Sequence, residues 1–131
     1  MATEFTVRTD ERTQVVDVTD DVAAALPDGA EGTCTVFVGH TTAGVVVQEA
    51  ESRLLTDVER AIDRLVSEDG WRHDEIDDNA DAHLKSMLLG EHVTVPVSDG
   101  QLAVGTWQSI LFVECDGPRS RTVTVVADGG E

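Results

Sequence analysis

The chain has 131 residues and a net charge of −17, from 26 acidic and 9 basic side chains. The length suits a single domain, and 40% hydrophobic residues are enough to form a core, so the composition excludes a disordered chain. The negative charge excludes proteins that bind nucleic acid or anionic membranes, because binding to phosphates needs cationic side chains.

The first part of the chain predicts strands around one short helix. The predicted strands are residues 3–8, 13–18, 33–39 and 44–48. The first two flank Asp10-Glu11, a pattern typical of a hairpin or paired strands. Asp20-Asp21 begins a short helix through Leu26, because Pro27 follows directly.

The middle of the chain changes to a helical period. Apolar residues recur at helical spacing from about Ala50 to Val66, which predicts the longest helix. The polar residues 67–78 predict a loop. A second helix is expected from Asp78 or Asn79 to Leu89, ended by Gly90, with Leu84 and Leu88 marking its buried stripe and Met87 close to it.

The remaining sequence predicts strands again, at residues 92–97, 101–105, 109–115 and 121–127. Asp99-Gly100 between two of them is a strong hairpin signal. Strands outnumber helices, and the helices lie in mid-chain. We therefore expect an α+β fold that is β-sandwich-like, with largely antiparallel sheets and two main helices, in a single domain over residues 1–131.

Composition and cysteine usage indicate a cellular setting. No apolar run approaches the roughly 20 residues that span a bilayer, and the amino terminus has no basic segment before an apolar one. We therefore expect a cytoplasmic protein.

Cys34 and Cys115 lie in strand-like runs and are interpreted as small hydrophobic residues, with a disulfide as the alternative. Many acidic residues beside a single lysine, Lys85, predict a halophilic protein in which salt screens the repulsion between charges.

Three histidines are the main candidates for chemistry. His40 follows a predicted strand, His73 lies in the acidic loop and His83 lies on the second helix. Three imidazoles form a metal site if the fold brings them together, but none of them has the i, i+4 spacing of a helical zinc motif. His40 is alternatively a general base beside Thr41 and Thr42, whose hydroxyls would bind an oxyanion, or these residues only complete a turn.

Further candidates carry carboxylates, cations or an aromatic ring. Glu49 and Asp57 would act as a general base or support a metal ligand, unless they are simply solvated. Glu114 interrupts an apolar run and needs a partner such as Arg119 or Arg121. These two arginines are also among the few cations available to bind a phosphate. Trp107-Gln108 either lines a pocket or packs in the fold.

An ordered set of motifs resembles the YjbQ family, described as secondary thiamine-phosphate synthase-like, over about residues 5–127. The motifs are His40-Thr41-Thr42-Ala43-Gly44, residues 78–86, Leu89-Gly90, Val95-Pro96-Val97, Gly105-Thr106-Trp107-Gln108 and residues 116–121. The resemblance implies a compact α+β fold assembled as a trimer or a multiple of one. It also implies a divalent metal, zinc first and magnesium second, at His40, His73 and His83. After the first histidine the family often has Asn-Glu-Asn, and here only Glu49 of that triplet is present.

From this resemblance we expect a small metal-binding enzyme that acts on a phosphate-bearing small molecule. Its reaction would be a thiamine-phosphate synthase-type transfer, as a weak or secondary activity, because the chain has one lysine and no Gly-rich phosphate loop. Glu49 and Asp57 are the catalytic candidates. The expected substrate-binding residues are Thr41, Thr42, Ser86, Trp107, Gln108, Arg119 and Arg121. The alternatives are a metal-assisted hydrolase of phosphorylated metabolites and a non-enzymatic oligomer that binds a metal or a small molecule.

Overall fold

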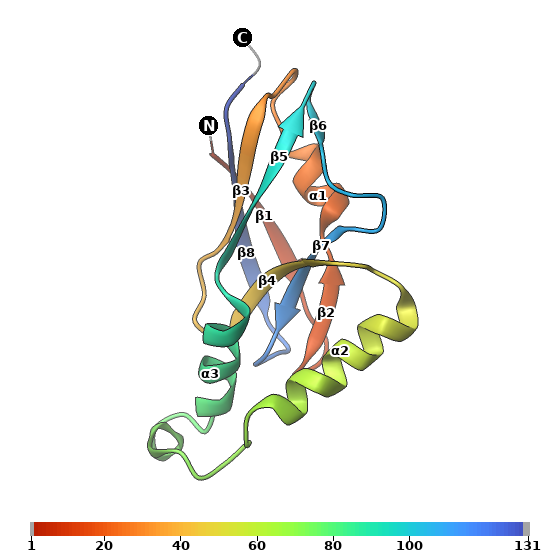
Figure 1. Cartoon of the computed structure of the whole chain (residues 1–131). Helices are drawn as coiled ribbons and strands as arrows, with labels where there is room; N and C mark the ends of the chain where they lie inside the picture. The colour runs from red at the N-terminus through yellow and green to blue at the C-terminus, as the bar shows by residue number, and fades with distance from the viewer. Residues whose placement is uncertain (1, 130–131) are drawn as a thin grey trace.

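Two antiparallel sheets form the body of the molecule in the computed structural model, which describes residues 2–129 (Figure 1). The sheets have the strand orders β1-β8-β3-β5-β6 and β2-β7-β4. The strands are β1 (Ala2–Arg8), β2 (Gln14–Asp17), β3 (Gly32–Val38), β4 (Ala43–Gln48), β5 (His92–Ser98), β6 (Gln101–Leu102), β7 (Ser109–Glu114) and β8 (Ser120–Ala127). The predicted α+β class with antiparallel sheets is confirmed.

In the described part of the chain, three α-helices accompany the sheets: α1 (Thr19–Ala24), α2 (Ser52–Leu65) and α3 (Ala80–Leu89). Glu51 caps α2 by accepting hydrogen bonds from the backbone N–H groups of Arg53 and Leu54. The predicted loop 67–78 contains a short 3-10 helix, η1 (Arg72–Glu75). Within residues 2–129, no helix combines the length and apolar character that crossing a membrane requires.

The predicted pairing of the first two strands is wrong. β1 pairs with β8, whereas β2 pairs with β7 in the other sheet. The chain crosses between the sheets at residues 9–13, where the side chain of Gln14 accepts hydrogen bonds from the N–H groups of Asp10 and Glu11. The hairpin at Asp99-Gly100 is confirmed. Both residues have positive φ, 54° and 76°, as a two-residue hairpin turn requires.

Side chains from the two sheets form the core between them. Val36 and Val123 of the larger sheet belong to the same buried cluster as Val45 and Phe112 of the smaller one. Both cysteines are free and buried, in agreement with their interpretation as small hydrophobic residues. Burial also raises the pKa of Cys115 to about 12, so this thiol is unreactive at neutral pH.

Helix α3 buries a different face from the one predicted. Met87 and Leu88 are 77% and 65% exposed, so the predicted apolar stripe does not lie in the core. The helix instead buries Asp81, Lys85 and Ser86. This face is stable because its polar groups are paired: Lys85 donates to Asp81, and Ser86 Oγ donates to the carbonyl of Ala43 on β4.

Candidate functional site

A chain of polar contacts joins two predicted site histidines to a predicted phosphate-binding arginine. The rings of His73 and His83 meet edge to face, with centroids 4.8 Å apart. His73 Nε2 lies 3.1 Å from Asn79 Oδ1, and Asn79 Nδ2 donates to Asp116 Oδ2 at 2.9 Å. Arg119 Nη2 donates to the same oxygen at 3.0 Å. Segments far apart in sequence therefore converge at the start of α3.

This contact chain also fixes the tautomer of His73. Asn79 uses its amide nitrogen on Asp116, so it presents its oxygen to His73, and His73 Nε2 is the donor. In the neutral ring, Nδ1 then carries the free lone pair. His73 is therefore arranged as a proton acceptor at Nδ1.

His40 lies at the end of β3 beside β8. Strand β3 ends at Val38, opposite Val123, and provides no paired residue beside the next position of β8, Thr122. The ring takes that place, with His40 Nε2 accepting from the N–H of Thr122 at 3.0 Å. Burial, together with the positive charge of Arg121, lowers the pKa of His40. The ring is therefore neutral at pH 7 and carries its proton on Nδ1.

Glu114 and Arg121 form a buried ion pair in which Arg121 Nε donates to Glu114 at 2.9 Å. Thr9 Oγ1 donates to the same carboxylate, and Arg121 also donates to Thr42 Oγ1 at 2.9 Å. Burial opposes ionisation of Glu114, but hydrogen bonds from Arg121, the N–H of Asp116 and Thr9 outweigh it and hold the pKa below the ordinary value. The expected partner of Glu114 is thus present, and Arg121 is committed to it.

The histidines of one copy do not form the expected three-histidine arrangement. Within residues 2–129, no group of three or more His, Cys, Asp or Glu side chains is placed to hold a metal ion. His40 has no free lone pair, because Nε2 accepts from Thr122 and the neutral ring is protonated at Nδ1. Metal ligation by His40, His73 and His83 would need a rearranged His40 or further ligands, and it stays a prediction.

The other predicted site residues lie elsewhere. Thr42 precedes β4 and Glu49 follows it, and a strand of this length separates them by roughly 20 Å. Glu49 and the exposed Trp107 line a cavity of about 420 Å³ with Asp17 and Glu51. Gln108 accepts a hydrogen bond from the N–H of Gly105. Asp57 is exposed on α2, and Thr41 is exposed in the turn before β4. Ser86 is buried on α3.

Sequence reasoning did not select several residues that organise the site. Asn79 and Asp116 connect His73 to Arg119, and both stand inside motifs that carry the family resemblance. Arg12 and Asp81 form a second polar pair, and Arg12 Nε lies 4.0 Å from Asp116. Arg12 and Asp81 are 69 residues apart, so no local sequence pattern predicts their contact.

Comparisons with known proteins agree with the fold and the motifs. The profile of the family "UPF0047 protein YjbQ-like" matches residues 3–130. A UPF0047 protein of Archaeoglobus fulgidus is 46% identical over 125 residues, covering 95% of this chain and 98% of its own. YugU of Bacillus subtilis is 35% identical over 122 residues, covering 88% and 90%.

Solved structures show the same architecture. The crystal structure of hypothetical protein APE1520 from Aeropyrum pernix K1 matches with a TM-score of 0.94 and 46% identity, covering 98% of both chains. The conserved hypothetical protein TT1486 of Thermus thermophilus matches with a TM-score of 0.87 and 35% identity, covering 96% of this chain and 99% of its own. The names of these relatives describe no reaction. By profile, sequence and structure, this chain belongs to the YjbQ-like UPF0047 family.

Proposed function

We propose that this chain is an enzyme acting on a phosphate-bearing small molecule at the site that contains His40, His73, His83 and Arg119. The contact chain from His83 to Arg119 carries the proposal, because it holds a proton acceptor and a cation in a fixed relation. The side chain of Arg119 is 51% exposed, and Asp116 orients it. Its remaining N–H groups can bind phosphate oxygens in a bidentate manner.

The histidines would divide the chemistry between them. In the transfer reaction the attacking thiazole nitrogen carries no proton, and neutral His40 donates its Nδ1–H to an oxygen of the leaving pyrophosphate. In the hydrolysis, Nδ1 of His73 accepts a proton from the attacking water, and His40 donates in the same way to the phosphate. His83 packs against His73 and holds its ring. A bound zinc or magnesium ion would supply Lewis-acid chemistry. The first candidate reaction is a transfer of the thiamine-phosphate synthase type. Metal-assisted hydrolysis of a phosphate ester and binding without turnover are the alternatives.

One set of assays separates these possibilities. Protein purified without a histidine tag is assayed for metal content and for coupling of a pyrimidine pyrophosphate to a thiazole phosphate. Phosphorylated metabolites are then screened with and without chelator. We expect Arg119→Met to lower turnover at least about tenfold in either reaction and His73→Ala to do so in the hydrolysis, as is typical when an oxyanion contact or a general base is lost. Arg64→Met, exposed on α2, is the matched control for Arg119→Met.

Three outcomes contradict the proposal or redirect it. Release of inorganic phosphate without coupling favours the hydrolase. Ligand-induced thermal stabilisation without any turnover favours a binding protein. Equal activity in the wild type, His73→Ala and Arg119→Met places the chemistry elsewhere.

We also propose that copies of the chain assemble as a trimer or a multiple of one. The outward face of the larger sheet supports this proposal. Phe37 on β3 and Val126 on β8 are 43% and 45% exposed there. The other outward positions of these two strands are Thr33, Thr35, Ser120, Thr122 and Thr124, so neither strand presents a carboxylate on this face. In a chain of net charge −17, such a face is where two copies can approach most closely.

A further inference from the structure

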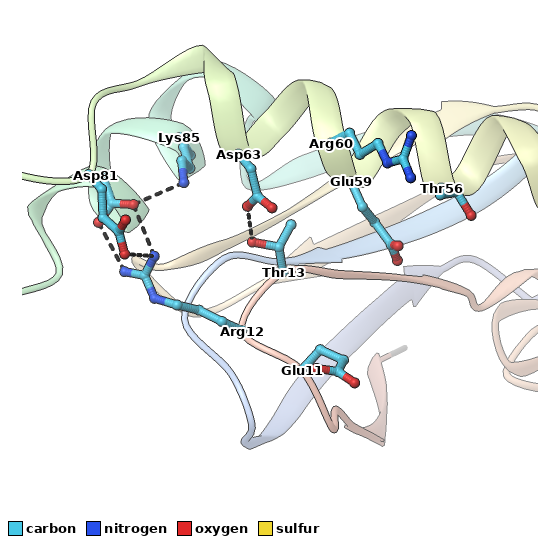
Figure 2. Close-up of a pocket in the computed structure, with 10 residues that line it drawn as sticks. Glu11, Arg12, Thr13, Thr56, Glu59, Arg60, Asp63, Asp81 and Lys85 are labelled. Carbon is cyan, nitrogen blue, oxygen red and sulfur yellow. Dashed lines mark hydrogen bonds and ion pairs between the residues drawn. The ribbon is translucent and has the colours of Figure 1, made fainter.

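Three of the four sheet edges in the described part of the chain are short or covered. The edge strand β6 has only two residues. At the edge formed by β4, the N–H of Val45 donates to a carbonyl at the end of α3. At the edge formed by β2, the N–H of Val15 donates to Glu59 of α2, and Thr13, just before the strand, donates to Asp63 of the same helix (Figure 2).

The fourth edge, β1, is open. Its seven residues pair with β8 without interruption from Ala2 to Arg8, and within residues 2–129 no strand pairs with its other side. Exposed edges of this length are usually blocked by a lysine, a proline, a bulge or a covering helix. β1 contains neither lysine nor proline, and its register has no break. Its outer row of N–H and C=O groups is therefore able to pair with an added strand.

The side chains of β1 are self-complementary in an antiparallel pair centred on Thr6. This register places Glu4 of each copy opposite Arg8 of the other, on the outward face where both are exposed. On the core side it places the half-buried Phe5 opposite Val7 of the other copy. Cross-strand pairs of opposite charge, and of an aromatic with a β-branched residue, both stabilise a sheet.

Glu4 and Arg8 have no such partner inside one copy. Within residues 2–129 neither belongs to an ion pair, and four positions along a strand separate them by roughly 14 Å. Shifting the pairing by two residues loses the match. One shift places Glu4 opposite Asp10, and the other places Arg8 opposite Ala2.

We propose that β1 is a docking edge for β1 of a second copy, so that two larger sheets join into one continuous antiparallel sheet with a two-fold axis at Thr6. The proposal rests on the trimer proposed above and specifies its multiple, which is a hexamer of two trimers. The two-fold axis is normal to the larger sheet. If the outward faces of three copies surround a three-fold axis, the two axes meet at right angles, which is the symmetry of a closed hexamer.

Three edge contacts have to act together in this hexamer. One pair of seven-residue strands is about 24 Å long, and it buries less than the roughly 1,000 Å² that a stable interface needs. Two trimers bring three such pairs together at once, so their effects combine. Free monomers are therefore not expected to dimerise through β1 alone.

Multi-angle light scattering in about 0.15 M KCl, where closely spaced charges still interact, tests the charge pairs. We expect the mass of a hexamer for the wild type and of a trimer for Arg8→Glu, which places carboxylates opposite each other. The exchange Glu4→Arg/Arg8→Glu keeps the net charge and should restore the hexamer. Arg64→Glu, exposed on α2, is the matched control and should stay hexameric.

A cysteine at the two-fold axis tests the register independently of charge. Thr6→Cys would face its own copy with Cα atoms about 4.5–5.5 Å apart, within the range of a disulfide. Glu4→Cys would lie roughly 14 Å from its copy. Mild oxidation should therefore link Thr6→Cys into covalent dimers and leave Glu4→Cys unlinked on non-reducing gels. Both native cysteines are buried and do not compete.

The edge pairing and the trimer fail separately in these experiments. A trimeric wild type, a hexameric Arg8→Glu, no restoration by the charge exchange, or equal cross-linking of the two cysteine variants would overturn the edge pairing and leave the trimer standing. A monomeric wild type would overturn both.

Discussion

Arg119 and Arg121 lie two residues apart but differ in their surroundings. Arg121 is 4% exposed and donates to the buried carboxylate of Glu114 and to Thr42. Arg119 is half-exposed and holds Asp116 from the solvent side. One residue type therefore has two roles at the start of β8: Arg121, on the strand, stabilises the junction of the two sheets, and Arg119, just before it, is available to a ligand.

Substitution of each arginine by methionine should separate these roles. Arg121→Met leaves the carboxylate of Glu114 buried without its cation, which should reduce the free energy of unfolding by about 3–5 kcal/mol. Arg119→Met removes an exposed ion pair and should cost less than about 1 kcal/mol. Urea unfolding of both variants measures the difference. Similar losses in the two would contradict the structural role of Arg121.

The lowered pKa of His40 makes stability depend on pH. The unfolded chain binds a proton near the ordinary value of 6.5, whereas the folded chain binds it only at lower pH, because burial and Arg121 disfavour the charged ring. The stabilising contribution of His40 to the free energy of unfolding is therefore present above pH 6.5. It is lost as the pH falls through the lower pKa of the folded state.

The variant His40→Gln tests this dependence. The glutamine amide oxygen can accept a hydrogen bond from the N–H of Thr122 but does not titrate. On acidification from neutral pH to below the folded pKa of His40, the free energy of unfolding of this variant should therefore fall less than that of the wild type. His92→Gln, at the exposed start of β5, controls for loss of an imidazole. If the free energy of unfolding of His40→Gln changes with pH in parallel with that of the wild type, His40 does not cause the pH dependence of stability.

At the level of elements, α3 and β4 meet at Gly44. A Cβ at this position would lie 2.8 Å from the carbonyl oxygen of Gly90 and 2.8 Å from Leu89 Cβ. Only a glycine leaves room for the end of α3, and the N–H of Val45 donates to that same carbonyl. This contact aligns α3 and therefore positions Asn79, His83 and Ser86 with respect to the smaller sheet.

Gly44→Ala should therefore reduce the free energy of unfolding by about 1–3 kcal/mol, because backbone must move to admit the methyl group. Gly39→Ala is the matched control, since its Cβ would meet only the ring of Phe37, at 3.5 Å. Thermal unfolding of both variants measures the effect. Equal stability of the two would show that α3 tolerates a shift along β4.

Local patterns predicted the elements well, and long-range contacts account for the errors. Alternation of β-branched residues predicted β3, β4, β5 and β8 because that signal lies within each strand. The partner of β1 is more than 100 residues away, so proximity in sequence gave a wrong hairpin. The burial of Lys85 depends on Arg12 and Asp81, and an apolar period cannot reveal it.

The same distinction applies to the candidate site. His73 and Asn79 are six residues apart, and both lie in segments that were expected to hold site residues or motifs. Their connection to Arg119 depends on Asp116, which the tertiary structure brings to Asn79 from 37 residues away. Sequence reasoning thus selected the histidines and the arginine, while the contacts that join them required the fold.

At the level of the whole molecule, the net charge of −17 should make stability depend on salt. We expect the free energy of unfolding to rise from dilute buffer to about 1 M KCl, where the screening length falls to about 3 Å. The variant Asp10→Asn/Asp28→Asn/Asp69→Asn, at exposed positions, should need less KCl for the same stability. Equal stability in dilute buffer and in molar KCl would contradict the halophilic interpretation.

Association of copies has to overcome the same repulsion between negative charges. Measuring the oligomeric state therefore tests whether copies meet on the outward face of the larger sheet. Multi-angle light scattering should give the mass of a trimer or a multiple of one for the wild type, more completely at high KCl. Thr35→Glu/Phe37→Glu places two carboxylates on the outward face of β3 and should give folded monomers, because the contact would then bury charges without partners. Met87→Glu, on the exposed side of α3, is the control for added charge. A monomeric wild type, or an unchanged mass in the β3 variant, would show that copies do not meet on this face.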